Sequence, residues 1–178
     1  FVQREDVMQV VEGMISLLFQ ELKGIELKRP ITSLTYEEAM NRFGSDKPDL
    51  RFGLELRDFT DALRQCQARV FAAAIQNGGV VKGIRIPQGG ELSRKDLDDM
   101  TPYVATFGAK GIAWTKITAE GWQSPIAKFL SPAEQKAVEK IAGAEIGDVV
   151  LFSAASAKIV HDALGNLRLY LGEKLAVV

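Results

Sequence analysis

The feature that most constrains the fold is an uninterrupted apolar run near the end of the chain. Residues 148–152 read Asp-Val-Val-Leu-Phe, so four apolar side chains follow one carboxylate. A short continuous run of this kind is typical of a strand in a central position of a sheet. The apolar residues after it recur at helical spacing and predict a helix from about residue 155 onward.

Residues 68–170 alternate short strand-like and helix-like stretches with glycine turns between them. The Asn77-Gly78-Gly79 turn separates two apolar stretches, and Asn-Gly tolerates the positive φ of a tight hairpin turn. It therefore predicts a β-hairpin in which residues 70–75 pair with residues 80–86. A further strand is predicted over residues 111–117.

Two helices in this region begin at serine residues. Ser93 and Ser131 are each followed three positions later by a carboxylate, the pattern of a capping box. Thr101-Pro102 falls inside the first helix and predicts a kink or a break there. The order strand-strand-helix-strand-strand-helix predicts an α+β two-layer sandwich, with an antiparallel sheet and the helices on one face.

The first part of the chain is predicted to be mainly helical. Residues 5–23 carry apolar side chains at spacings of three and four, which predicts an amphipathic helix that ends at Gly24. A capping pattern at residues 35–38 begins a second, short helix that ends at Gly44. Residues 54–57 alternate apolar and charged side chains, as a half-buried strand does.

A charged loop over residues 42–53 connects the short helix to this strand. Pro48 disfavours helix at the residue before it, and Gly44 and Gly53 permit turns that a side chain would hinder. Many charges of both signs in so short a connector mark the loop as a candidate functional surface. The other interpretation is a solvated loop whose charges pair with one another.

Composition excludes several classes of protein. With 47% hydrophobic and 25% charged residues, the chain is neither disordered nor a collagen, and its one cysteine, Cys66, rules out an internal disulfide. The net charge is -1, whereas a stand-alone nucleic-acid-binding protein usually has a large positive charge. The single histidine, His161, has no second ligand at helical spacing, and no nucleotide loop or nucleophile elbow occurs. We therefore predict neither catalytic residues nor a metal site.

One further segment combines aromatic and basic residues. Residues 122–129 include Trp122, Lys128 and Phe129. Such a loop can meet RNA by base stacking and phosphate contact, with Lys128 as the cation. It can equally be a lid over the core of its own domain.

Several blocks resemble a known family. Residues 36–39 and 42–51 resemble the segment after motif 2 in the bacterial type of aspartyl-tRNA synthetase. Later blocks resemble the insertion of that family called the GAD domain, which also occurs in an archaeal glutamyl-tRNA amidotransferase subunit. These later blocks are Ile84-Arg85-Ile86-Pro87, Tyr103-Val104, Gly108-Ala109-Lys110-Gly111, Ser124-Pro125-Ile126-Ala127-Lys128-Phe129 and Leu167-Arg168-Leu169.

The resemblance implies a division of the chain. Residues 1–58 would belong to a class II catalytic domain, residues 59–170 to the GAD insertion, and residues 171–178 to the return into the catalytic domain. Residue 1 would follow motif 2 and residue 178 would precede motif 3, so the chain is expected to be a fragment. The family's residues that hold ATP and activated aspartate then have no counterpart here, and the fragment alone is expected to be inactive.

For the parent protein, the resemblance implies an enzyme that joins aspartate to tRNA through an aspartyl-adenylate, with ATP and Mg²⁺. It implies a cytoplasmic homodimer, and no membrane span is expected from the sequence. The resemblance also gives the loop a role. Ser45, Asp46, Lys47, Asp49 and Arg51 would order the junction between catalytic domain and insertion, or contact the end of the tRNA.

Three alternatives remain. An accessory tRNA-binding module would bring its basic residues onto one face; these are Arg64, Arg69, Arg94, Lys95 and Lys128. A GAD domain of an amidotransferase would account for residues 68–170 but not for the loop before them. A merely structural insertion, braced against the catalytic body, is the third alternative.

Overall fold

The computed structural model describes residues 1–175 and divides the chain into two compact units, Phe1–Thr35 and a second unit from Tyr36 onward. The two units are described separately. Of the expected return segment over residues 171–178, the last three residues lie outside the described part. The proposed boundaries at residues 58 and 170 remain predictions, and helix α7 continues through residue 170.

The first unit contains the predicted amphipathic helix, α1 (Arg4–Lys23). Gln3 and Asp6 form a capping box at its start, and Gly24 ends it in the left-handed region with φ 66°. Beyond it, the Glu12 carboxylate accepts a hydrogen bond from the Ile31 amide at 3.1 Å. The apolar side of α1 is exposed. None of the described helices is long and apolar enough to cross a membrane.

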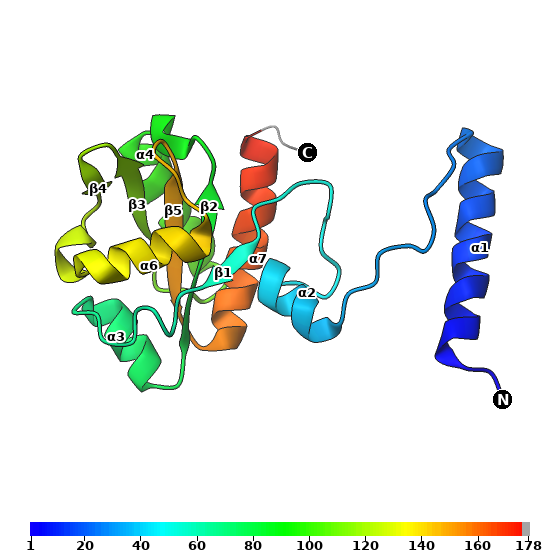
Figure 1. Cartoon of the computed structure of the whole chain (residues 1–178), viewed down its shortest axis with the longest axis horizontal. Coiled ribbons are helices and arrows are strands. Elements are labelled where there is room, and N and C mark those ends of the chain that lie inside the picture. The colour runs from blue at the N-terminus through cyan, green and yellow to red at the C-terminus, as the bar shows by residue number, and fades with distance from the viewer. Residues whose placement is uncertain (176–178) are drawn as a thin grey trace. The chain divides into compact units, whose positions relative to one another are not determined.

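The second unit is built on a five-stranded antiparallel sheet in the order β1-β2-β5-β3-β4 (Figure 1). The predicted central strand is confirmed, because β5 pairs with β2 on one side and β3 on the other. The strands are β1 (Leu56–Asp58), β2 (Val80–Ile86), β3 (Ala113–Thr118), β4 (Gly121–Gln123) and β5 (Val149–Ala155).

Helices cover both faces of this sheet rather than one. Val149 and Leu151 of β5 belong to one buried cluster, while Val150 and Phe152 belong to a second. Since neighbouring side chains of a strand point to opposite faces, a continuous apolar run needs cover on both. The α+β class and the antiparallel sheet are confirmed, but the two-layer arrangement is wrong for this reason.

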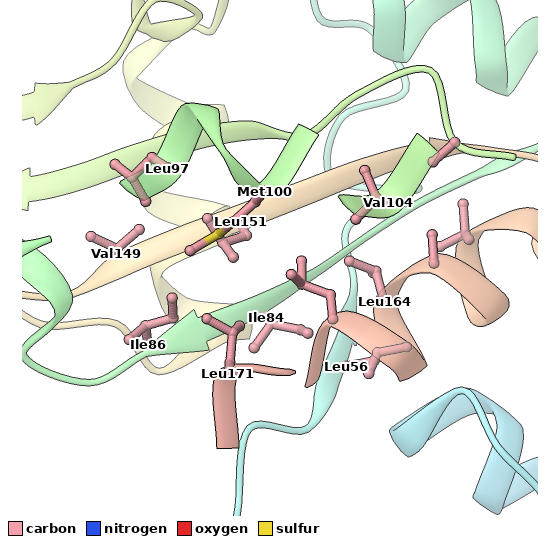
Figure 2. Packing of buried hydrophobic residues seen from close by; sticks show 14 residues of the cluster. Leu56, Ile84, Ile86, Leu97, Met100, Val104, Val149, Leu151, Leu164 and Leu171 are labelled. Atoms are coloured by element: carbon pink, nitrogen blue, oxygen red, sulfur yellow. The ribbon is translucent and has the colours of Figure 1, made fainter. Parts of the chain in front are cut away.

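The first cluster lies between the sheet and three helices, and Figure 2 shows Leu97, Met100 and Leu164 of these helices in the same cluster as Leu151 of β5. These helices are α4 (Arg94–Asp98), α5 (Met100–Ala105) and α7 (Ala157–Lys174). The second cluster lies under α3 (Arg69–Gln76) and α6 (Pro132–Ala142). The chain also forms α2 (Tyr36–Phe43) and two 3-10 turns, η1 (Gly89–Glu91) and η2 (Ala127–Phe129).

The predicted hairpin of residues 70–75 with 80–86 is wrong, because the first of these stretches is helix α3. Phe71 and Ile75 are four residues apart, so both reach the same core from one side of a helix. The three alanines between them favour helix strongly. The Asn-Gly pair therefore ends a helix rather than joining two strands.

Local signals at the helix ends are confirmed. Ser93 and Ser131 each form the predicted capping box, and the helix with Thr101-Pro102 is split into α4 and α5. The loop predicted over residues 122–129 is partly wrong, because its first two residues belong to strand β4. It is only three residues long, which is too short to show a clear alternation of apolar and polar residues.

Candidate functional site

The loop over residues 44–53 is organised by one side chain, Arg168 of α7, which is 1% exposed. Its Nη2 donates hydrogen bonds to the backbone oxygens of Asp49 at 2.7 Å, Phe52 at 2.8 Å and Gly53 at 2.9 Å. Its Nε donates a further bond to Gly53 O at 3.1 Å. A guanidinium has several donors in a rigid plane, so one side chain can satisfy three carbonyls of a folded loop.

The same guanidinium lies against two aromatic rings. Its central carbon is 4.1 Å from the centre of the Phe52 ring and 5.0 Å from that of Phe43. Both rings are buried, so these cation–π contacts are largely shielded from water. Burial lowers the pKa of Arg168, and the charges of Asp49 and Glu55 oppose that shift. The buried charge is thus compensated by carbonyls and rings rather than by a direct ion pair.

A close backbone contact fixes the start of the loop on the same helix. A Cβ placed on Gly165 would lie 2.7 Å from Gly44 O, and one placed on Gly44 would lie 2.4 Å from His161 O. Gly44 also has φ 70°, which side chains disfavour. Glycine is therefore needed on both sides for the end of α2 to reach α7.

Two ion pairs, one within the loop and one beside it, further constrain the loop. The Arg51 side chain donates to Asp49 with Nη2–Oδ2 at 2.6 Å, and Asp49 Oδ1 accepts from the Arg51 amide at 2.9 Å. These bonds lower the pKa of Asp49 to about 2. Arg42 pairs with Glu55 through two hydrogen bonds at 3.1 and 2.7 Å, and this pairing lowers the pKa of Glu55.

The five loop residues predicted as a site differ in their contacts and exposure. Asp49 and Arg51 pair with each other, as the solvated-loop interpretation expects. Ser45 Oγ accepts a hydrogen bond from the Lys47 amide at 3.3 Å, which bends the tip of the loop. Asp46 and Lys47 are exposed at this tip, and their side chains form no ion pair with another described residue.

The basic residues expected of a tRNA-binding module do not all lie on one face. Arg94 and Lys95 are on α4, which covers the first cluster, whereas Arg69 is on α3 over the second cluster, across the sheet. Arg64 and Arg94 are also paired, with Asp61 and Asp98. Lys128 lies apart from the loop on η2, with Nζ 5.0 Å from the centre of the Phe129 ring.

The described residues include no group of three or more His, Cys, Asp or Glu side chains that could hold a metal ion. Cys66 is buried, and burial raises the pKa of its thiol. His161 is half-buried on α7, where burial and the charge of Lys82 lower its pKa. Cys66 and His161 therefore pack in the interior of the second unit.

Arg168 is the residue that sequence reasoning missed as a contributor to this site. A signal was present, because Arg168 lies four residues from Leu164 and next to Leu167, on the buried side of α7. A cation on the apolar face of a helix needs a compensating partner in the interior. The sequence did not reveal that this partner is the backbone of a loop more than 100 residues earlier.

Comparison of the sequence with known protein families and proteins identifies similar proteins. A family model described as the GAD domain matches residues 71–164, which is more than half of the chain. An aspartate–tRNA(Asp/Asn) ligase of Geotalea uraniireducens (strain Rf4) is 46% identical over 178 residues, which are 100% of this chain and 30% of the relative. The enzyme of the same name from Natranaerobius thermophilus is 47% identical, with the same coverage.

A third such ligase, from Aquifex aeolicus (strain VF5), is 45% identical over 178 residues and is covered to 29% of its length. The chain therefore spans about a third of the curated relatives it matches, and the similarity extends beyond the GAD match to the loop and to α1. From the family match and the sheet and helices described above, the chain belongs to the GAD domain family.

Proposed function

We propose that the chain is a segment of an aspartate–tRNA ligase, which joins aspartate to tRNA using ATP. The observation that carries this proposal is the 46% identity along the whole chain to ligases of that name. It accounts for the loop over residues 44–53, which the GAD match over residues 71–164 does not include. An amidotransferase subunit that shares only the GAD domain leaves the loop unexplained.

The exposed side of α1 supports a place within a larger protein. A contiguous apolar stripe on a soluble helix marks a surface that packs against other protein. In the whole ligase, the remaining domains would cover this stripe. Its members are Val7, Val10, Val11, Met14, Leu17, Leu18 and Leu22.

Aspartate, ATP and tRNA are then substrates of the whole protein, which would act as a homodimer in the cytoplasm. The resemblance also implies Mg²⁺ for the parent enzyme. The described residues supply no ligand cluster that fits a metal ion, so no step of the reaction is assigned to Mg²⁺ on this segment. The role proposed for this segment is positioning and RNA contact.

We assign that role to the loop over residues 44–53. Arg168 holds its backbone and the Gly44–Gly165 contact fixes its start, so the tip is presented in one defined conformation. Lys47 is the exposed cation at the tip, Ser45 bends the backbone before it, and Asp46 is exposed beside it. An exposed lysine on a loop whose two ends are anchored suits contact with a phosphate of the tRNA end.

Replacing Lys47 with alanine in the whole ligase tests this role. We expect kcat/KM for tRNA to fall about three- to tenfold, since a hydrogen bond to a charged group contributes about 1.5–3 kcal/mol when it is shielded and less when it is exposed. The measurement is aminoacylation at several salt concentrations, where the variant should also show a weaker salt dependence. Aspartate-dependent pyrophosphate exchange should be unchanged.

The matched control is Lys136→Ala, which removes an exposed lysine from α6. If Lys47→Ala and Lys136→Ala charge tRNA with the same kinetics as the unmodified ligase, the loop has a structural role only.

A further inference from the structure

An apolar groove of about 540 Å³ lies on the side of the sheet covered by α3 and α6. It is lined by Phe152 of the central strand β5, Val70 of α3, Ile112 before β3 and Phe129 of η2. Segments distant in the sequence therefore form one concavity. Its volume lies in the range typical of small-ligand sites, about 300–1,000 Å³.

The groove opens at a part of the sheet that β4 does not cover. β4 pairs only with Lys116–Thr118 of β3, so the preceding part of β3 has β5 on one side and no strand on the other. Gly111 and Ile112 line the groove just before β3 begins. The Trp114 carbonyl in this part of β3 accepts a hydrogen bond from Ser124 Oγ, so the groove offers a ligand mainly apolar contact here.

The charges at the groove are of one sign. Arg69 and Lys110 line it and are exposed, and no aspartate or glutamate is among its lining residues. Neither cation forms an ion pair with another described residue, in contrast to Arg64, which pairs with Asp61. Cations left unpaired beside apolar surface favour a ligand with a flat apolar part and a negative charge.

A second hollow continues from the groove, sharing Gln67 and Phe129, and adds Lys128. Its one carboxylate, that of Glu134, is engaged in the capping box of α6, where it accepts bonds from the Ser131 amide at 2.7 Å and hydroxyl at 2.8 Å. The Phe129 side chain is 40% exposed between the two hollows. Lys128 Nζ lies 5.0 Å from the centre of this ring, and an exposed aromatic ring beside a cation is the usual arrangement of a stacking platform for single-stranded nucleic acid.

We propose that this groove binds one unstacked base of a single-stranded tRNA segment, with Phe129 stacking on the base and Arg69, Lys110 and Lys128 contacting adjacent phosphates. The proposal rests on the proposed function, which makes tRNA the available ligand. An extended apolar peptide is the competing occupant, but the uncompensated cations favour RNA.

The test measures binding of fluorescein-labelled oligoadenylate to the chain, with duplex RNA as the comparison. We expect the single strand to bind more tightly than the duplex. Phe129→Ala should weaken single-strand binding about 5- to 150-fold, the range for one base stacked on an aromatic ring. Phe129→Tyr keeps the ring and should restore binding, whereas Phe129→Leu keeps only an apolar side chain and should not.

Two further variants test the phosphate contacts. Arg69→Ala and Lys110→Ala should each weaken binding and each lower the salt slope by about 0.7. Lys140→Ala, which removes an exposed lysine of α6 outside the groove, should bind as the unmodified chain does. Circular dichroism of every variant checks that it is folded.

Equal binding of oligoadenylate by Phe129→Ala and the unmodified chain would overturn the proposal, as would binding of an apolar peptide in the groove without RNA binding. This outcome is separable from failure of the proposed function. A whole protein that does not charge tRNA with aspartate contradicts the proposed function, while the oligoadenylate titration still decides the occupant of the groove.

Discussion

Replacing Arg168 with methionine is expected to lower the free energy of unfolding of the second unit by about 3–5 kcal/mol, because one buried and two partly buried carbonyls lose their donor, at about 1–3 kcal/mol for the buried one and less for the others. The acceptors are the backbone oxygens of Asp49, Phe52 and Gly53. Methionine fills similar volume between Phe43 and Phe52, so the loss is chiefly that of hydrogen bonds and cation–π contacts.

Urea unfolding followed by circular dichroism measures this change. Arg94→Met is the control, since Arg94 is an exposed arginine of α4 and its loss should cost at most about 0.5 kcal/mol. Arg168→Lys should recover little stability, because an ammonium cannot replace the planar fork of donors. Limited trypsin digestion gives a local readout: cleavage after Arg51 should be faster in Arg168→Met. Equal unfolding midpoints and equal cleavage rates for Arg168→Met and Arg94→Met would contradict the role of Arg168.

Asp148→Asn is expected to have the second largest effect. Asp148 is 0% exposed, and its carboxylate accepts hydrogen bonds from Arg85 Nε at 2.6 Å and from the amides of Glu145 at 2.8 Å and Gln88 at 2.9 Å. An asparagine has the same shape but directs an NH₂ group toward some of these donors. We expect a loss of about 2–4 kcal/mol, since the amides of Glu145 and Gln88 and the partly exposed Arg85 side chain then share one acceptor oxygen in place of a buried carboxylate.

The pH dependence of this contribution has a definite sign. Burial alone raises the pKa of Asp148, but the hydrogen bonds from Glu145, Gln88 and Arg85 outweigh it, so the pKa is lowered below 3.8. A carboxylate with a lowered pKa in the folded state stabilises the protein above its unfolded pKa, and this stabilisation is lost as the pH falls through the folded value. The stability of the unmodified chain should therefore decrease below about pH 4.

Denaturant titrations between mildly acidic and strongly acidic pH provide the measurement. In Asp148→Asn the decrease should be shallower but still present, because Asp49 and Glu55 also have lowered pKa values. Asp162→Asn serves as the control, since Asp162 forms an exposed pair with Lys158. An Asp148→Asn variant with the same acid profile as the unmodified chain would contradict the assigned hydrogen bonds.

The sequence predicted those features of the fold that depend on neighbouring residues. The capping boxes at Ser93 and Ser131 and the left-handed end of α1 at Gly24 involve groups within one helical turn. The central position of β5 follows from its own apolar run. Each of these signals can be read without knowing what the segment packs against.

The errors arose where packing decides the structure. Residues 69–76 have a turn signal after them that suits a hairpin, but their apolar residues meet one core on the α3 side of the sheet. The same apolar run in β5 that indicated a central strand also required helices on both faces, a consequence that the predicted element order did not include. Composition is compatible with a strand or a helix at residues 69–76 and with helices on one or both faces of the sheet. Contacts between residues distant in the sequence decide which of these forms.

In the candidate site, too, the local features could be predicted from the sequence and the long-range contacts could not. The charge and glycine content of residues 42–53 marked the loop, and the Asp49–Arg51 pair is local enough to be anticipated. Arg168 acts across a separation of 115 residues or more, and its acceptors are backbone oxygens, which carry no sequence signature. The loop could thus be located from sequence, whereas the group that gives it a defined shape could not.

The most direct test of the account is charging of tRNA with aspartate by the whole protein that contains this chain, together with aspartate-dependent pyrophosphate exchange by the 178-residue chain alone. The account predicts that the whole protein forms aspartyl-tRNA in the presence of ATP, and that the isolated chain supports no exchange. Failure of the folded whole protein to use aspartate, or exchange by the isolated chain, would contradict the proposal that these residues are a non-catalytic segment of an aspartate–tRNA ligase.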